Sequence, residues 1–355
     1  MKIKGLVLAG GTGSRLRPLT YTGAKQLIPV ANRPILFYAI DALVEAGITD
    51  IGVIVGDTAQ EVQRALGTGE QFGATLTYIT QEAPLGLAHA VKSARRFLGD
   101  EAFLMFLGDN LLRGGVQDLV DRFRAGDYAA SILLTQVGDP RQFGVAVLDG
   151  DRVVRLVEKP KDPPSSWALV GVYCFSVVIH EAVATLRPSW RGEYEITDAI
   201  QQLIDWDLAV DAARVQGWWK DTGRPEDVLE ANRLVLEDLV DARLGAVDVD
   251  STITGRVAIN PGARIVRSVV RGPVSIAEGV TVEDSYIGPY TALGPQVTVR
   301  RCEIENSVIL SDSTIEDIDT RIDQTLLGRG VTVKGRKSRP RALRFVLGDQ
   351  SQAEI

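Results

Sequence analysis

The sequence predicts an α/β protein of two domains followed by a short tail. Three observations carry this prediction. The chain has 355 residues, more than one domain usually contains. Short apolar runs rich in β-branched residues alternate with amphipathic stretches over residues 1–240. Over residues 241–335 only short β-branched runs broken by glycine and proline remain. Residues 336–355 form the tail, for which the sequence predicts no structure.

In the first domain, apolar runs predict strands at GLVLA (5–9), IGVIV (51–55), AFLMFL (102–107) and AASILLT (129–135). Helices are expected at 34–46, 87–98, 115–125, 196–205 and 224–239, the first opened by Pro34. This alternation indicates helices packed on a mostly parallel, Rossmann-like sheet. Between residues 143 and 175, alternating runs around Asp149-Gly150 predict a hairpin inserted on that sheet.

The second domain shows a six-residue periodicity. Aliphatic side chains recur six residues apart in four blocks, which are Ile253, Ile259 and Ile265; Ile276 and Val282; Ile287, Leu293 and Val299; and Ile309 and Ile315. That spacing is typical of a hexapeptide β-helix, in which each short strand stacks an inward aliphatic side chain on the coil below. A β-sandwich is the alternative, but its strands recur roughly every 8 to 12 residues, so the β-helix is favoured.

Composition and charge exclude several classes of protein. A formal net charge of −7 argues against a nucleic-acid or membrane-surface partner. No apolar run suits a signal peptide or a membrane span, so we expect a cytoplasmic protein. Cys174 and Cys302 lie far apart among apolar neighbours, as buried thiols do in a reducing compartment. His89 and His180 are expected to be structural residues of helices. Residues 181–355 contain no histidine, which argues against base-catalysed acetyl transfer by the β-helix.

The stretch LVLAGGTGSRLRPLT, residues 6–20, holds the first chemical signal. It does not match a P-loop, and Leu16 stands where a dinucleotide fingerprint needs its third glycine. A glycine-rich loop after a strand lets backbone N–H groups approach a phosphate chain, which Arg15 and Lys25 could neutralise. Taken alone, such a turn is as often purely structural, so the downstream residues decide the interpretation.

Six further segments are AKQLIPV (24–30), QEAPLGLAHA (81–90), LGDN (107–110), VEKP (157–160), RGEYEITD (191–198) and WWKDTG (218–223). With the glycine loop, and in this order, they make the first 230 residues resemble the sugar-1-phosphate nucleotidylyltransferases. The resemblance is closest to the branch that transfers a thymidylyl group to glucose 1-phosphate. It implies a nucleotidyltransferase domain at residues 1–240 and a left-handed β-helix at 241–335, as in longer members that supply dTDP-glucose for deoxysugar biosynthesis.

The resemblance implies roles at the nucleotide end of the site. Asp109, which ends an apolar strand, and Asp221 would be the ligands of Mg²⁺. Arg15 would stabilise the departing pyrophosphate, and Lys25 would hold phosphate oxygens near the transferred phosphorus. The implied nucleotide-binding residues are Leu8, Gly10, Gly11, Gly13, Gln81 and Gly86. Of these, Gln81 and Gly86 match positions that pair with the edge of the base.

At the sugar end, Lys159 would bind the phosphate of the incoming sugar and Glu158 would accept its hydroxyls. The other implied sugar-phosphate contacts are Gly144, Tyr173, Glu193 and Thr197. Tyr194 stands where the family often has leucine, so the match is less close here. Without the resemblance, a Glu-Lys pair on a hairpin would be read as a surface ion pair. Arg15, Lys25, Asp109, Lys159 and Asp221 together form the expected catalytic set.

The implied reaction is Mg²⁺-dependent thymidylyl transfer from dTTP to α-D-glucose 1-phosphate, with release of pyrophosphate. UTP in place of dTTP is an alternative, because Gln81 could pair with uracil as well as thymine. An inactive regulatory or scaffold subunit is a second alternative, disfavoured because all four of Arg15, Lys25, Asp109 and Asp221 are present. A homo-oligomer is expected, and the β-helix is expected to serve assembly or regulation.

Overall fold

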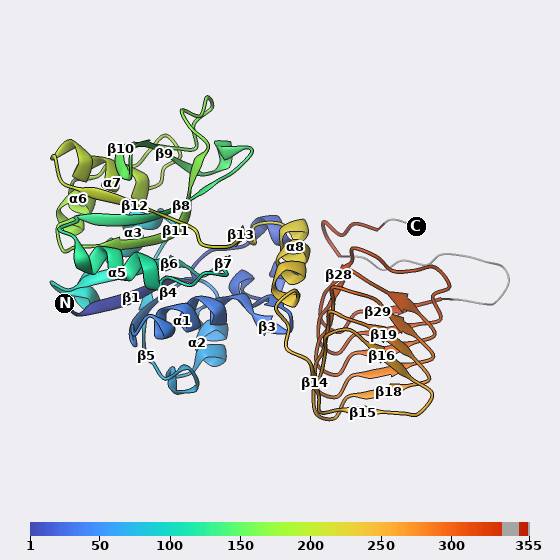
Figure 1. Ribbon diagram of the computed structural model, residues 1–355. Coiled ribbons are helices and arrows are strands. Elements are labelled where there is room, and N and C mark those ends of the chain that lie inside the picture. Colours follow the sequence, from blue (N-terminus) through green and yellow to red (C-terminus); the bar gives the residue numbers. More distant parts are fainter. Residues whose placement is uncertain (336–347, 354–355) are drawn as a thin grey trace. The chain divides into compact units, whose positions relative to one another are not determined.

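The computed structural model describes residues 1–335 and 348–353, which form two compact units (Figure 1). The first unit holds residues 1–12, 23–27 and 35–221, and the second holds 13–22, 28–34 and the chain from 222 onward. Most of the predicted tail, 336–347 and 354–355, lies outside the described residues. No helix in the described ranges has the length and hydropathy to span a membrane.

The first unit is built on a nine-stranded sheet in the order β5-β4-β1-β6-β11-β8-β12-β10-β9. The strands are β1 (Ile3–Leu8), β4 (Asp50–Val55), β5 (Thr75–Thr80), β6 (Ala102–Leu107), β8 (Ala130–Gln136), β9 (Gly144–Asp149), β10 (Arg152–Glu158), β11 (Trp167–Phe175) and β12 (Val210–Arg214). Neighbours among β5, β4, β1 and β6 are parallel, as are β8 and β12. Strand β11 runs antiparallel between β6 and β8, and the predicted hairpin is β9–β10 at the sheet edge.

Helices cover the sheet because its strands alternate apolar side chains between two faces. In β1, Val7 belongs to the core on one face and Leu6 to the core on the other. The helices are α1 (Ile35–Glu45), α2 (Ala59–Leu66), α3 (Leu87–Ser93), α4 (Arg95–Leu98), α5 (Gln117–Ala125), α6 (Ile179–Thr185) and α7 (Ile196–Asp205). The helix expected at 87–98 is therefore two helices separated at Ala94, while α7 has the expected bounds. His89 and His180 lie in α3 and α6, as predicted.

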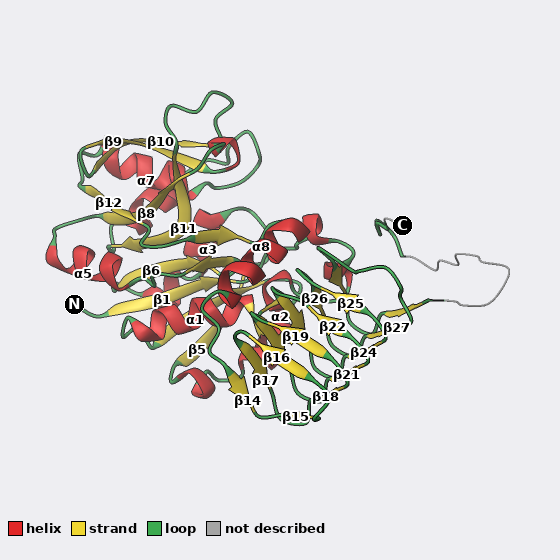
Figure 2. Cartoon of the chain, turned by 45° about the vertical axis from the view of Figure 1, so that its right-hand side comes forward, coloured by secondary structure: helices red, strands yellow, loops and turns green. Residues whose placement is uncertain are grey.

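The second unit contains three parallel sheets of short strands, a β-helix as predicted (Figure 2). The first sheet stacks β14 (Ala242–Arg243), β17 (Val257–Ile259), β20 (Val274–Ile276), β23 (Thr291–Leu293), β26 (Val308–Ile309) and β28 (Leu326–Leu327). The second stacks β15 (Ala246–Val247), β18 (Arg264–Val266), β21 (Thr281–Glu283), β24 (Thr298–Arg300), β27 (Thr314–Glu316) and β29 (Thr332–Lys334). The third stacks β16 (Thr252–Thr254), β19 (Val269–Arg271), β22 (Tyr286–Ile287) and β25 (Glu303–Ile304).

The register explains why the six-residue period slips between blocks. Ile259 pairs with Ile276 and Ile276 with Leu293, so these neighbouring coils are seventeen residues long instead of three full hexapeptides. One of the three sides of each such coil is a residue short. The predicted inward side chains are buried in one core, apart from Ile253 in the outer strand β16, which is half-buried against it.

An N-terminal hairpin of the second unit packs on its β-helix. The hairpin of β2 (Pro29–Val30) and β3 (Arg33–Pro34) turns at Ala31 and Asn32. Asn32 Nδ2 donates to the carbonyl oxygens of Ser275 (3.1 Å) and Leu293 (2.9 Å). Helix α8 (Pro225–Leu236) joins the same contact, because Asn232 Oδ1 accepts from Ala31 N at 2.9 Å. The β-helix, α8 and the hairpin are therefore tied together by hydrogen bonds.

Candidate active site

The glycine loop follows β1 where the carboxyl ends of β1, β4 and β6 meet. The N–H of Gly108 donates to the carbonyl of Leu8 at 2.9 Å, so the segment after β6 begins beside the loop. Gly10 lies against Gly56, and a Cβ added to Gly56 would come within 3.1 Å of the Gly10 carbonyl oxygen. An added Cβ on Gly11 would meet the Gln26 amide at 3.3 Å. Small residues thus keep open the backbone that a phosphate would approach.

Lys25 and Asp109 form the charged centre of the first unit. Lys25 Nζ lies 2.5 Å from Asp109 Oδ2, and the lysine side chain is only 7% exposed. The other oxygen, Oδ1, accepts from Asn110 Nδ2 at 2.9 Å, and Asn110 Oδ1 accepts from Trp219 Nε1 at 2.6 Å. Each oxygen of the Asp109 carboxylate therefore accepts from a donor, and the predicted catalytic pair is in direct contact.

Asp221 is brought to the same place by strand pairing. Strand β7 (Asn110–Leu112) runs antiparallel to β13 (Trp219–Asp221), and Asp221 is the register partner of Asn110. Asp109 is thus adjacent to the residue that faces Asp221. Two carboxylates on adjoining backbones suit Mg²⁺, which is commonly held by one or two carboxylates plus substrate phosphates. The described residues contain no group of three or more His, Cys, Asp or Glu arranged for a metal.

Gln81 and Gly86 are also in contact. Gln81 Nε2 lies 3.1 Å from the carbonyl oxygen of Gly86 and 3.1 Å from His89 Nδ1. Gly86 has φ 102°, and an added Cβ would come within 2.5 Å of the Tyr194 carbonyl, so only glycine fits. An added Cβ on Gly10 would lie 3.6 Å from Gln81 Oε1. The structure therefore brings Gly10, Gln81 and Gly86 together after β1 and β5.

Predicted sugar contacts gather between the hairpin and the start of α7. Thr197 Oγ1 donates to Glu158 Oε2 at 3.0 Å, and an added Cβ on Gly144 would meet the Thr197 methyl at 2.6 Å. Lys159 follows with φ 41°, and its backbone N–H donates to the Phe143 carbonyl at 3.1 Å. Lys159 Nζ lies 3.6 Å from Glu158 Oε1. The hairpin thus presents the Lys159 ammonium beside the Glu158 carboxylate, which also accepts from Thr197.

Arg191 is a central residue of this cluster that the sequence analysis missed. Its guanidinium contacts Glu158 at 3.4 Å, Glu193 at 2.8 Å and Glu195 at 3.3 Å. Glu195 is only 4% exposed, and burial raises the pKa of its carboxyl, with repulsion from Glu158 adding to the effect. Ser189 Oγ and Arg191 oppose that rise. The available signal was one arginine followed by carboxylates two and four residues later in RGEYEITD.

Tyr173 is placed differently from an open sugar contact. It lies in β11, is 3% exposed and stacks on Phe175 with ring centroids 5.7 Å apart. Burial, with a contribution from Glu158, raises the pKa of its hydroxyl well above the ordinary value. Tyr173 therefore stays protonated, packed in the core near Glu158.

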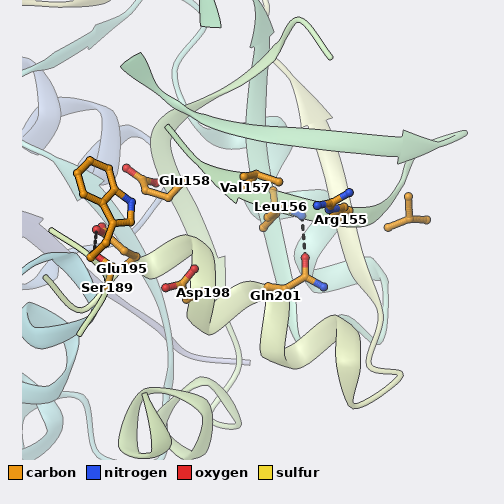
Figure 3. Close-up of a pocket in the computed structure, with 10 residues that line it drawn as sticks. Arg155, Leu156, Val157, Glu158, Ser189, Glu195, Asp198 and Gln201 are labelled. Carbon is orange, nitrogen blue, oxygen red and sulfur yellow. Dashed lines mark hydrogen bonds between the residues drawn. The ribbon is translucent and has the colours of Figure 1, made fainter. Parts of the chain in front are cut away.

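A surface cavity of about 680 Å³ adjoins this cluster (Figure 3). Its wall includes Glu158, Trp190, Glu195 and Asp198, and Trp190 is 86% exposed. Figure 3 shows Ser189 bonded to Glu195 on this wall. Of the predicted site residues only Glu158 lines the cavity, so none of the predicted nucleotide contacts is part of its wall.

Gly13 and Arg15 belong to the second unit. Gly13 has φ 63°, and its carbonyl accepts from Leu16 N at 2.9 Å and from Thr20 Oγ1 at 2.7 Å. These bonds close a turn of 3₁₀ helix, Ser14–Leu16, on which Arg15 is exposed. The structure thus places Arg15 on the surface of a short, internally bonded turn, and its role toward a phosphate stays a prediction.

Comparison with known proteins shows which family and which relatives this chain resembles. A family model described as nucleotidyl transferase matches residues 4–238. A glucose-1-phosphate thymidylyltransferase of Streptomyces antibioticus is 54% identical over 99% of both chains. A low-salt glycan biosynthesis nucleotidyltransferase of Haloferax volcanii is 50% identical over 99% of this chain and 100% of its own. A crystal structure from Bacillus anthracis, assigned as a glucose-1-phosphate thymidylyltransferase and solved with a sucrose, has TM-score 0.63 and 35% identity, covering 68% of this chain and 98% of its own.

Proposed function

The chain belongs to the nucleotidyl transferase family, and on this premise we propose that it transfers a thymidylyl group from dTTP to α-D-glucose 1-phosphate. Full-length similarity to a thymidylyltransferase supports the substrates. The observation that carries the chemistry is the contact of Lys25 with Asp109. Asp109 precedes Asn110, the residue that pairs with Asp221, so the two carboxylates lie on neighbouring backbone segments. The product, dTDP-glucose, would feed deoxysugar biosynthesis.

The residues present suit direct transfer. A sugar-phosphate oxygen attacks the α-phosphorus of dTTP, and the bond from that phosphorus to the bridging oxygen breaks, so its electron pair leaves with pyrophosphate. Such a step needs cations and in-line positioning more than a base. Lys159 would hold the attacking phosphate, Lys25 the α-phosphate oxygens and Arg15 the leaving pyrophosphate.

Mg²⁺ would be held by Asp109 and Asp221, and when bound it would offset the negative charge of the phosphates. The fit rests on two observations: Asp109 is the chain neighbour of Asn110, which pairs with Asp221, and the Lys25 ammonium contacts the Asp109 carboxylate. Lys25 also limits negative charge at the centre before substrates bind. Gly10, Gly11 and Gly13 would admit the phosphate chain, with Leu8 ending the strand beneath it.

At the sugar end, Glu158 would accept glucose hydroxyls while Thr197 and Arg191 orient its carboxylate. Gly144 lets Thr197 and Glu158 approach each other, since a Cβ there would meet both side chains. Glu193 is held by Arg191 beside it. The sugar is therefore read by carboxylates whose orientation is fixed before it arrives.

UTP remains the second candidate for the nucleotide, because Gln81 and Gly86 would face a base edge that thymine and uracil share. The 5-methyl group distinguishes the two bases, and one methyl in a pocket changes selectivity by roughly 10- to 200-fold. An inactive scaffold is the third candidate.

The deciding experiment is the initial rate of pyrophosphate release with Mg²⁺, crossing dTTP and UTP with glucose 1-phosphate and N-acetylglucosamine 1-phosphate. We expect the highest kcat/KM with dTTP and glucose 1-phosphate, and its loss in Asp109→Ala. Better turnover with UTP would assign the chain to the uridylyl branch. No turnover with any pair in the parent protein would overturn the proposal in favour of the scaffold.

A further inference from the structure

We propose that His89 is a positioning residue for the nucleobase, because it fixes which end of the Gln81 amide faces the base. The proposal rests on the proposed function, in which Gln81 and Gly86 read the base. It concerns a histidine that the sequence analysis treated as structural. Gln81, Gly86 and His89 all lie in the first unit, the first two in the loop between β5 and α3 and the histidine in α3.

The hydrogen bonds determine the orientation of the amide. The Gly86 carbonyl oxygen can only accept, so the Gln81 atom 3.1 Å from it must be the nitrogen Nε2. The same nitrogen lies 3.1 Å from His89 Nδ1, which must therefore accept the second amide hydrogen. The imidazole proton is thus on Nε2 of His89, and the ring is neutral.

The surroundings of His89 favour that neutral state. Burial lowers the pKa of the imidazole, and the nearby Lys92 ammonium lowers it further, while Glu82 opposes them. The ring of Tyr194 stacks on the imidazole, with ring centroids 6.2 Å apart. An acceptor at Nδ1 is therefore present at neutral pH.

Once a base donor takes the Gly86 carbonyl, the Gln81 Nε2–H that pointed at it is released, and the two groups then offer the base an adjacent donor and acceptor. Thymine and uracil present the complementary edge, an O4 acceptor beside an N3–H donor. Cytosine presents the reverse, an amino donor beside an unprotonated N3. When a base takes the Gly86 carbonyl, Gln81 loses that partner. The bond to His89 Nδ1 then remains and keeps the amide nitrogen of Gln81 in place. It opposes a flip of the amide that would present the oxygen, an acceptor for the amino group of cytosine.

The test compares His89→Ala with His89→Asn in the full chain, with dTTP, UTP and CTP as nucleotides. His89→Ala should raise the KM for dTTP and for UTP by roughly three- to tenfold, the value of one neutral hydrogen bond, and narrow the preference over CTP. His89→Asn should restore the parent KM values for dTTP and UTP and the preference over CTP, because Asn Oδ1 can replace Nδ1 as the acceptor. The KM for glucose 1-phosphate should not change in either variant.

The matched control is His180→Ala, which removes the protein's second histidine; His180 lies in α6 and its ring stacks on Phe103. It should leave the preference for dTTP over CTP unchanged. A pH profile adds a second readout. As the pH falls through the lowered pKa of His89, Nδ1 becomes a donor and the KM for dTTP should rise in the parent protein. That additional rise should be absent in His89→Asn, whose amide does not titrate.

An active parent in which His89→Ala keeps the full preference over CTP would overturn the proposal. Equal effects in His89→Ala and His180→Ala would do the same, because they would indicate a loss of stability alone. A parent protein with no turnover on any nucleotide would instead contradict the proposed function. The two failures are therefore distinguishable.

Discussion

Lys25 Nζ contacts Asp109 Oδ2 at 2.5 Å, and the two side chains differ in exposure, 7% for the lysine against 25% for the aspartate. Asp109→Asn would leave a buried ammonium without its counter-charge. We expect a loss of about 1–3 kcal/mol in the free energy of unfolding, less than a fully buried pair would lose, because water reaches the aspartate. Turnover should fall by at least about 100-fold.

Lys25→Met separates stability from catalysis in this pair. It removes the buried charge and leaves Asp109 partly solvated, so stability should be kept while turnover is lost. Asp118→Asn, an exposed carboxylate of α5, is the control and should change neither. Urea unfolding and initial rates on all three variants check this, and equal destabilisation by Asp109→Asn and Lys25→Met would contradict it.

Arg191 joins three carboxylates of the predicted sugar site, so its removal should act on the sugar phosphate. Arg191→Ala should raise the KM for glucose 1-phosphate by roughly tenfold, because Glu158 loses a donor and the buried Glu195 loses its cation. The KM for dTTP should stay within about twofold. Steady-state kinetics with each substrate varied in turn, beside the exposed Arg187→Ala, measure this split. A larger change in the KM for dTTP than in the KM for glucose 1-phosphate would refute the placement of Arg191 at the sugar-phosphate site.

Leu19 connects the turn that carries Gly13 and Arg15 to the β-helix within the second unit. It packs in one cluster with Ala292, Val308 and Leu310, and its neighbour Thr20 donates to the Gly13 carbonyl at 2.7 Å. Leu19→Ala should loosen the turn that carries Arg15, so the KM for dTTP should rise several-fold while that for glucose 1-phosphate stays constant. Stability should fall by about 1–2 kcal/mol, since Leu19 is half-buried.

The control for Leu19 is Val282→Ala, which opens a cavity in the β-helix core. It should reduce stability without changing the KM for dTTP. Amide hydrogen exchange of residues 13–22 provides a readout independent of activity, and should become faster only in Leu19→Ala. Similar exchange in both variants would show that the β-helix does not hold the loop through Leu19.

Cys302 occupies a serine position in a corner of the β-helix. Ser285 Oγ accepts from Cys302 N at 3.2 Å, and Cys302 Sγ in turn accepts from Ile318 N at 3.4 Å. Burial raises the pKa of the thiol, so it acts as a neutral acceptor. The free energy of unfolding of Cys302→Ser should lie within about 1 kcal/mol of the parent value. That of Cys302→Ala should be lower by about 1–3 kcal/mol, because the Ile318 N–H is left unpaired. Thermal unfolding of both variants decides, and equal losses would rule out the bond.

Local patterns were sufficient for much of the fold. The run AFLMFL predicted β6 with its observed bounds, and α7 matched its predicted range. The six-residue aliphatic spacing predicted the β-helix, although the seventeen-residue coil became visible only from the pairing of Ile259 with Ile276. The helix at 87–98 was predicted as one because its composition does not reveal the break at Ala94.

By itself the sequence determined the apolar strands, the β-helix period and, through its ordered motifs, the residues expected at the site. Only the tertiary structure decided that β11 runs antiparallel between β6 and β8, that Arg191 joins three carboxylates, and that residues 13–22 share a unit with the β-helix. The physical reason is the separation along the chain of the residues that make these contacts. Side-chain periodicity reports burial over a few neighbouring residues, whereas these contacts depend on packing and hydrogen bonds between residues far apart in the chain, which leave no local pattern.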